Sequence, residues 1–225
     1  MNKLLLSPQG CFGKPGLIFM KRAILFIDSS NVYHALKKGE MFEYFSYSWL
    51  FGELSKEFEI TKTYFYDAIK NEKIEPNGFR KQQQFHAKIE KEIPNLVVRH
   101  RKLKYNNVIK RAKEAEEKCE FCKDCKIKVP TFLKGAGLNK MSREKGIDVM
   151  LVIDMIKGAF QEKYDVALVV TGDADFVPAV ELVKTLKKEV INIHFYAGSS
   201  SELRQACDSH ILIGKDAKDK CFLSK

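Results

Sequence analysis

The sequence has few of the features that place a chain in a membrane or an oxidising compartment. No apolar run approaches the roughly 18 residues of a membrane-spanning helix. The N-terminal stretch has only three leucines before Ser7 and Pro8, too few for the apolar region of a secretory signal. Six cysteines, three of them within seven positions, do not make a disulfide scaffold. These absences predict a cytoplasmic protein in a reducing environment, with no membrane partner.

The composition otherwise belongs to an ordinary globular protein, with 45% hydrophobic and 30% charged residues. The length of 225 residues suits one α/β domain, or one domain with an insertion. The formal net charge of +10 is concentrated between Asn95 and Lys145, where 15 Lys and Arg residues stand against 6 Asp and Glu residues. A single basic segment in a nearly neutral chain favours a polyanionic partner.

Short apolar runs alternate with amphipathic stretches along most of the chain. Runs such as AILFID (23–28) and DVALVVT (165–171) are typical of buried parallel strands. Strands separated by helices predict right-handed βαβ units around a central parallel sheet, an α/β fold. The expected strands are 22–28, 61–69, 96–103, 165–171, 190–196 and 210–213, and the expected helices are 31–38, 47–58, 76–93, 146–160, 176–188 and 201–206.

Two of the predicted strands end in carboxylates. Asp28 closes the first strand, and Asp173 and Asp175 follow the strand that ends at Thr171. Ligands of open parallel sheets bind outside the carboxyl ends of the strands, and neighbouring strands lie about 5 Å apart. Carboxylates at that separation repel one another unless a cation lies between them, and such oxygen ligands suit Mg²⁺ or Mn²⁺. The pattern therefore predicts a divalent metal site, provided that the two strands are neighbours.

Asp148 adds a carboxylate in the first turn of the helix expected over 146–160, whose apolar composition predicts a buried helix. A partly buried Asp needs a partner or a metal, although an Asp at this position also favours the helix dipole. Turn and capping roles stay open for the other three carboxylates. Asp154 lies six positions after Asp148, on another face, and is expected to be a satisfied or surface residue outside the site.

Three blocks of the chain resemble the signature blocks of the NYN domain, a family of PIN-like nucleases, and the resemblance is strongest to its LabA-like branch. The blocks are FIDSSNVY (26–33), KGIDVMLVIDMI (145–156) and VVTGDADFVPAVELVK (169–184). The resemblance implies a Rossmann-like sheet in the order 3-2-1-4-5, a metal-dependent ribonuclease site and an acidic cleft. The family's functional positions fall on Asp28, Asn31, Asp148, Asp173 and Asp175.

The resemblance also implies a mechanism, metal-assisted hydrolysis of RNA phosphodiester bonds. One or two Mg²⁺ or Mn²⁺ ions are expected on Asp28, Asp148 and Asp173, and the ions would activate a bound water. Asp175 would complete the ligand set, and Asn31 would orient Asp28 or contact the substrate. The five scattered histidines are expected to be structural or surface residues.

The domain expected over 21–214 follows a flexible extension, 1–20, and precedes a loose polar tail, 215–225. An insertion at about 105–142 interrupts the domain and is not part of the family's minimal fold. It carries Cys119, Cys122 and Cys125, whose spacing is half of a zinc site. Three reduced thiols without metal, or an iron–sulfur cluster, are the alternatives. The candidates for a fourth ligand, among which the sequence does not choose, are His100, Cys11 and His86.

The basic segment is expected to bind RNA, because phosphate contacts dominate nucleic-acid affinity. Nearby aromatic residues, Tyr105, Phe121 and Phe132, either stack on unpaired bases or form the small core of the insertion. Trp49 and the aromatic residues around it are expected to form core or the surface of a homodimer. The proposed RNA-binding residues are Arg99, Arg101, Lys102, Lys104, Lys110 and Arg111.

Three functions follow from these features. The first is an endoribonuclease that uses Mg²⁺ or Mn²⁺. The second is a non-catalytic RNA-binding or regulatory module with a structural metal site. The third is an interaction protein whose acidic cleft binds a partner. Metal-dependent cleavage that is lost on substitution of Asp173 separates the first from the others.

Overall fold

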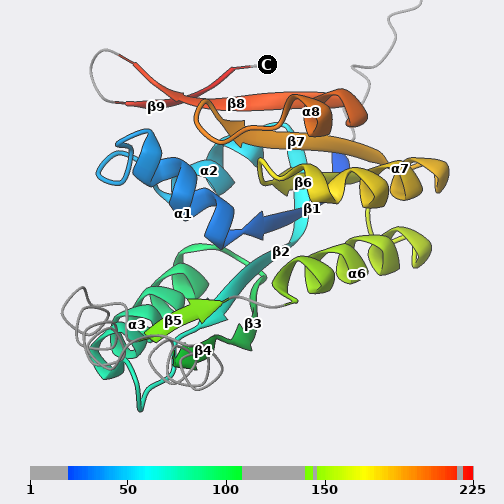
Figure 1. Ribbon diagram of the computed structural model, residues 1–225. Helices are drawn as coiled ribbons and strands as arrows, with labels where there is room; N and C mark the ends of the chain where they lie inside the picture. The colour runs from blue at the N-terminus through cyan, green and yellow to red at the C-terminus, as the bar shows by residue number, and fades with distance from the viewer. Residues whose placement is uncertain (1–19, 108–139, 144–145, 217–219, 225) are drawn as a thin grey trace, which may run out of the picture.

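The computed structural model describes residues 20–107, 140–143, 146–216 and 220–224. Its centre is a seven-stranded sheet in the order β3-β2-β1-β6-β7-β8-β9 (Figure 1), with every strand parallel to its neighbours except β9. The first five positions repeat the predicted order 3-2-1-4-5, which confirms the expected fold class. The strands are β1 (Lys21–Asp28), β2 (Phe58–Ile69), β3 (Leu96–Lys102), β6 (Val166–Val170), β7 (Glu189–Phe195), β8 (Ser209–Lys215) and β9 (Cys221–Ser224).

Helices cover both faces of the sheet because successive side chains of each strand point to opposite sides. In β1, Leu25 and Ile27 face one core, and Ile24 and Phe26 face the other. The first core contains side chains of α1 (Ser29–Lys38), α2 (Tyr47–Leu54) and α3 (Pro76–Glu92). The second contains side chains of α6 (Ile147–Phe160), α7 (Val177–Thr185) and α8 (Ser201–Ala206).

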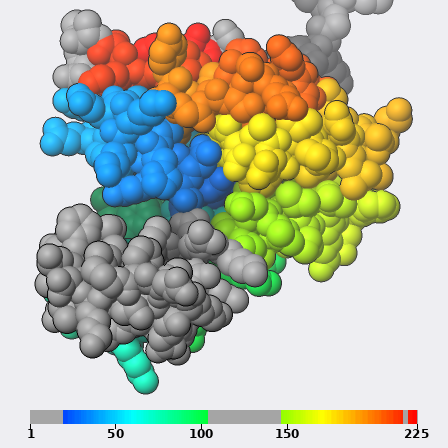
Figure 2. All heavy atoms as spheres, viewed as in Figure 1, coloured from blue at the N-terminus to red at the C-terminus, as the bar shows by residue number. Residues whose placement is uncertain are grey.

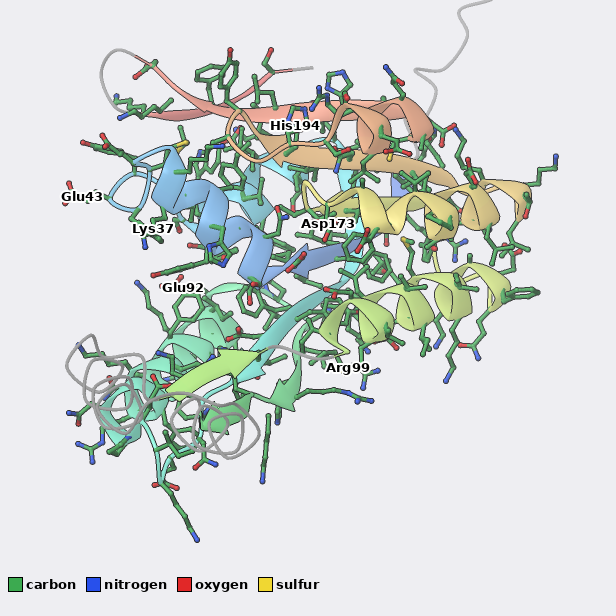
Figure 3. All side chains as sticks on the ribbon, viewed as in Figure 1. Lys37, Glu43, Glu92, Arg99, Asp173 and His194 are labelled. Carbon is green, nitrogen blue, oxygen red and sulfur yellow. The ribbon has the colours of Figure 1, made fainter. Side chains whose placement is uncertain are left out.

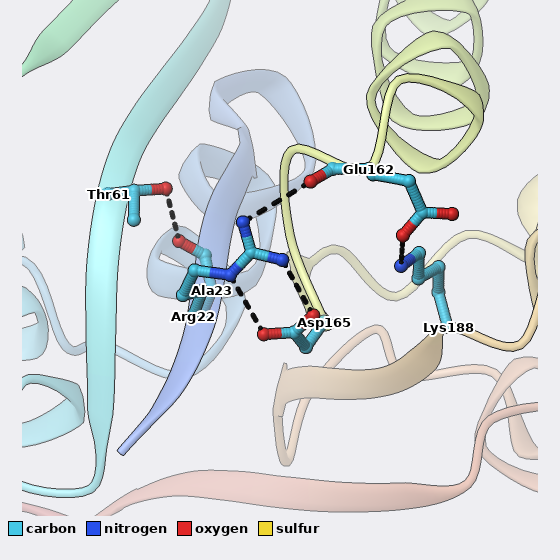
Figure 4. Close-up of polar contacts among 6 residues, drawn as sticks. All are labelled: Arg22, Ala23, Thr61, Glu162, Asp165 and Lys188. Carbon is cyan, nitrogen blue, oxygen red and sulfur yellow. Dashed lines mark hydrogen bonds and ion pairs between the residues drawn. The ribbon is translucent and has the colours of Figure 1, made fainter. Parts of the chain in front are cut away.

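Ion pairs and hydrogen bonds join the amino ends of β1, β2 and β6, at the edge of the sheet opposite the carboxylates (Figure 4). Arg22 donates from Nε and Nη2 to the two carboxylate oxygens of Asp165, at 3.0 and 2.9 Å. Thr61 Oγ1 donates to the carbonyl of Ala23, and Lys188 pairs with Glu162. These contacts link the strands and the loops before them at this end of the sheet.

Several boundaries differ from the sequence prediction. The helix expected over 47–58 ends at Leu54, because β2 begins at Phe58. The helix expected over 176–188 is a 3₁₀ turn, η1 (Ala174–Phe176), followed by α7. The expectation of a loose tail is wrong for Cys221–Ser224, which forms the antiparallel edge strand β9.

The expectation that α6 is buried is wrong for one of its faces. Leu151 and Met155 pack against the sheet, whereas Val149, Ile153 and Phe160 are exposed. Periodicity does not separate a helix buried all round from one that covers a sheet on one side.

Among the described helices, none is long and apolar enough to cross a membrane.

The described part of the insertion is a two-stranded antiparallel ladder, β4 (Lys104–Asn107) and β5 (Lys140–Arg143). Cys119, Cys122 and Cys125 lie outside the described residues, as do Cys11, Lys110 and Arg111. The zinc site therefore stays a prediction.

Candidate functional site

Asp28 and Asp173 lie at neighbouring strand ends. β1 and β6 pair in parallel up to Ile27 and Val170, so Asp28 and the segment after Val170 leave the same edge side by side. Figure 2 shows the segments around this edge meeting at one place on the surface, the blue α1 beside the yellow α7 and the yellow-green α6. The sheet thus produces the juxtaposition that the strand-end carboxylates predicted.

The Asp28 side chain is buried and hydrogen-bonded from two sides. Its Oδ1 accepts the backbone N–H of Asn31 at 3.1 Å, which makes Asp28 the N-cap of α1. Its Oδ2 accepts the hydroxyl of Thr171 at 3.1 Å, and Thr171 Oγ1 in turn accepts the backbone N–H of Asp173 at 3.3 Å. With 4% of its surface exposed, Asp28 is tied to the Asp173 loop through one hydroxyl.

Asn31 fixes the same loop from the other side. Its side-chain carbonyl accepts the backbone N–H of Gly172 at 2.8 Å, while the Gly172 carbonyl accepts the N–H of Ser200 at 2.9 Å. A Cβ at position 172 would lie 2.0 Å from the carbonyl oxygen of Gly198, so only glycine fits. Asn31 therefore positions the loop that carries Asp173.

Asp148 interacts electrostatically with two further carboxylates, Asp173 and Asp175. Burial, followed by the negative charges of Asp173 and Asp175, raises the pKa of Asp148 above its ordinary value. Asp148 comes from the start of α6. Asp173 caps the turn η1 after β6, and its Oδ1 accepts the N–H of Asp175, within that turn, at 3.0 Å. Figure 3 labels Asp173 in this region. Asp28, Asp148, Asp173 and Asp175 form what we call the acidic site.

Carboxylate oxygens are the ligands that Mg²⁺ and Mn²⁺ prefer, so the acidic site offers suitable donors for either ion. Among the described residues, no group of three His, Cys, Asp or Glu side chains has the geometry of a metal site. Mg²⁺ needs fewer protein ligands, because it keeps several waters and binds through one or two carboxylates. Asp148, Asp173 and Asp175 are accessible enough for this role, whereas Asp28 is buried.

Asp67, on β2, is a residue of this edge that the sequence reasoning missed. Its Oδ1 accepts Ser29 Oγ at 2.8 Å, and its Oδ2 lies 2.7 Å from both Gln82 Nε2 and His86 Nε2. The signal was an acidic residue in the apolar run TYFYDAI, one strand from Asp28. His86, a candidate zinc ligand, is buried and bonds Asp67.

The basic residues of β3 lie beside α6. Arg99 Nε lies 3.2 Å from Asp154 Oδ2, and its guanidinium lies over the Tyr64 ring at 5.5 Å. Arg101 Nε lies 3.4 Å from Met150 Sδ, in the first turn of α6. Asp154 is thus a satisfied residue outside the acidic site, as expected. The exposed side chains of Arg99, Arg101 and Lys102 form the described part of the predicted RNA-binding surface.

The family model described as NYN domain matches residues 22–214. The uncharacterized protein MJ0482 of Methanocaldococcus jannaschii is 36% identical over 70 residues, which cover 31% of this chain and 29% of that protein. The crystal structure of VPA0982, a protein of unknown function from Vibrio parahaemolyticus, has a similar fold, with a TM-score of 0.59 and 18% identity. That match covers 90% of this chain and 97% of the solved one.

Proposed function

We propose that this chain, which belongs to the NYN domain family of the PIN-like nuclease superfamily, is a metal-dependent endoribonuclease. The observation that carries the proposal is the electrostatic interaction of Asp148 with Asp173 and Asp175, at the strand edge where the buried Asp28 also lies. Burial, and after it the charges of Asp173 and Asp175, raises the pKa of Asp148, and a bound divalent cation favours the charged carboxylate. Membership of the LabA-like branch stays a prediction.

In this proposal, Asp148 and Asp173 hold Mg²⁺ or Mn²⁺, and Asp175 contributes a further oxygen. A bound ion supplies an activated water and neutralises charge on the phosphate under attack. Asp28 and Asn31 are positioning residues, because their hydrogen bonds hold the backbone from Thr171 to Asp173. Arg99 and Arg101, near α6, are suited to contact the RNA backbone.

One observation favours a second candidate function, a non-catalytic RNA-binding module. Within the described ranges, the acidic site does not present three converging ligands for a metal ion. A chain of this kind would bind RNA through its basic surface with a steep dependence on salt, and would not cleave it.

The test compares RNA cleavage by the wild-type chain and Asp173→Asn, with Mn²⁺, Mg²⁺ or EDTA. Asp165→Asn is the matched control, because Asp165 lies next to the same strand, β6, at its opposite end. Its exposed pair with Arg22 contributes little to stability, because solvent screens both charges. We expect metal-dependent cleavage by the wild type and Asp165→Asn and none by Asp173→Asn. Cleavage that persists in Asp173→Asn contradicts the proposed site.

A second readout separates metal binding from catalysis. Millimolar Mg²⁺ or Mn²⁺ is expected to raise the melting temperature of the wild type and of Asp165→Asn, because a ligand of the native state stabilises it. The increase should disappear in Asp173→Asn. RNA binding without cleavage, together with a melting temperature that Mn²⁺ leaves unchanged, would favour the binding module.

A further inference from the structure

A large cavity lies between α1 and α3, beside the acidic site rather than on it. Its volume is about 670 Å³, within the range of roughly 300–1,000 Å³ that is typical of ligand pockets. Ser29 and Ser30, which directly follow Asp28, belong to its lining, and so does Asp67. The lining of the α1–α3 cavity therefore begins at the residue that follows the buried Asp28 in the sequence.

Aromatic side chains line the cavity and are exposed to solvent. The Tyr33 and Phe42 rings lie 5.2 Å apart, with 52% and 47% of their surfaces exposed. Phe85, 38% exposed, lies 5.9 Å from Tyr47 across the cavity lining. Large apolar side chains that gather in an exposed position mark a binding surface more often than they serve the fold. These rings offer planar faces to a planar ligand.

Lysines surround the aromatic side chains. Lys70 pairs with Glu75 at 3.1 Å, and Lys88 lies 3.7 Å from Glu92, the residue labelled on α3 in Figure 3. Lys81 also lines the cavity, is exposed, and pairs with no acidic residue in the described part of the chain. Planar faces beside a lysine match a ligand that joins an aromatic ring to negative charge, as a nucleotide does.

The polar groups at the base of the cavity bond one another. Asp67 accepts from Ser29, Gln82 and the backbone of Ala68, and it bonds His86. Gln82 Oε1 accepts the backbone N–H of Lys70 at 3.0 Å. Because these groups are engaged, they hold the shape of the cavity and do not read the edge of a base. Recognition by stacking alone tolerates any base.

We propose that the α1–α3 cavity binds an unpaired base of the RNA strand whose phosphate lies at the acidic site. The inference rests on the proposed function, which it deepens by assigning a binding site for one base of the substrate to this cavity. A base held in a duplex is stacked and paired, so it does not reach the cavity without being extruded. The cavity therefore selects unpaired segments, with little preference for sequence.

The test measures binding in the Asp173→Asn background, so that no cleavage occurs. The probe is a single-stranded oligoribonucleotide with 2-aminopurine at one position, whose fluorescence falls when the base stacks on an aromatic ring. Tyr33→Ala and Lys81→Ala are each expected to weaken binding roughly tenfold and to restore the fluorescence. Tyr33→Phe keeps the ring and should bind as well as Tyr33.

The matched controls are Tyr196→Ala, which removes a tyrosine that is 90% exposed elsewhere, and Lys91→Ala, on the same helix as Lys81. Both should bind the probe like the parent. Equal binding by Tyr33→Ala and its parent, or equal binding of a duplex and a single strand, overturns the cavity proposal. Cleavage assays then test the proposed function separately. If binding depends on Tyr33 but the wild type does not cleave RNA, the nuclease proposal is wrong and the cavity proposal stands.

Discussion

Gly172→Ala is expected to damage the acidic site without touching any carboxylate. The added Cβ would lie 2.0 Å from the Gly198 carbonyl oxygen and 3.1 Å from Ser199 Cα, and both contacts are to backbone. Relief requires one loop to move, which strains the bonds that Gly172 makes to Asn31 and Ser200. Overpacking costs about 1–3 kcal/mol, and weakening two hydrogen bonds adds about 1–2 kcal/mol.

The expected loss of about 2–5 kcal/mol lowers the melting temperature by roughly 4–20 °C in a chain of this size. Urea and thermal unfolding measure this loss, and an RNA cleavage assay at a temperature where the variant is folded measures the effect on Asp173. Gly52→Ala is the matched control, because nothing lies within 4 Å of its Cβ position and it sits inside α2. That change should stabilise the helix by about 0.5–1 kcal/mol. A Gly172→Ala variant as stable as wild type would refute the reasoning.

Three further predictions concern single side chains. Asn31→Ala removes the acceptor of the Gly172 N–H, so unfolding titrations should show a loss of about 1–3 kcal/mol, and cleavage should fall with kcat rather than KM. Asp148→Asn removes a charge whose pKa is raised by burial and like charges, so calorimetry without metal should show a higher melting temperature, and added Mn²⁺ a smaller increase than in wild type. Burial lowers the pKa of His194, so stability is fully present above its unfolded value of 6.5 and is lost as the pH falls below it. The urea concentration at the unfolding midpoint should fall as the pH is lowered from about 7.5 to about 5.5. His194→Gln should reduce the dependence of this midpoint on pH.

Each of these three has a contradicting result. An Asn31→Ala variant with unchanged stability would mean that another group holds Gly172. A lower melting temperature for metal-free Asp148→Asn would mean that the charge of Asp148 favours the start of α6 more than its neighbours repel it. If the urea midpoint of His194→Gln depends on pH as strongly as that of the wild type, other groups cause the dependence. His210, whose Nδ1 lies 3.2 Å from His194 Nε2, is the nearest histidine.

The sheet and the carboxylate edge were predictable because local pattern determines them. AILFID and ALVVT are apolar runs that end in polar residues, and parallel strands place those ends on one edge. The pairing of β9 was not predictable, because Cys221–Ser224 is too short for a periodic signal and pairs only through its contact with β8. The exposed face of α6 was not predictable either, because α6 is apolar on most sides and its sequence does not show which side the sheet covers.

The polar cluster around Asp67 and the α1–α3 cavity were beyond the sequence for a different reason. Asp67 meets Ser29, Gln82 and His86 from positions 15 to 38 residues away, and no spacing rule links them. The cavity is bounded by α1, α3 and the segment between α1 and α2, so its aromatic side chains become one surface only after the sheet has formed. We predicted core or dimer surface for the aromatic residues of that segment. Phe42 is exposed in the cavity lining, so it is not core, and a dimer surface stays a prediction.

Asp28 and Asp173 end neighbouring strands, but their surroundings give them different roles. Asp28 is 4% exposed and accepts hydrogen bonds from Asn31 and Thr171, so its carboxylate is engaged before any substrate arrives. Asp28→Asn keeps an acceptor for the α1 N-cap, because asparagine caps helices as well as aspartate does. The variant should therefore fold and cleave weakly, whereas Asp173→Asn should fold and not cleave at all. Equal loss of cleavage and of the Mn²⁺-dependent rise in melting temperature in both variants would instead make Asp28 a direct ligand of the metal.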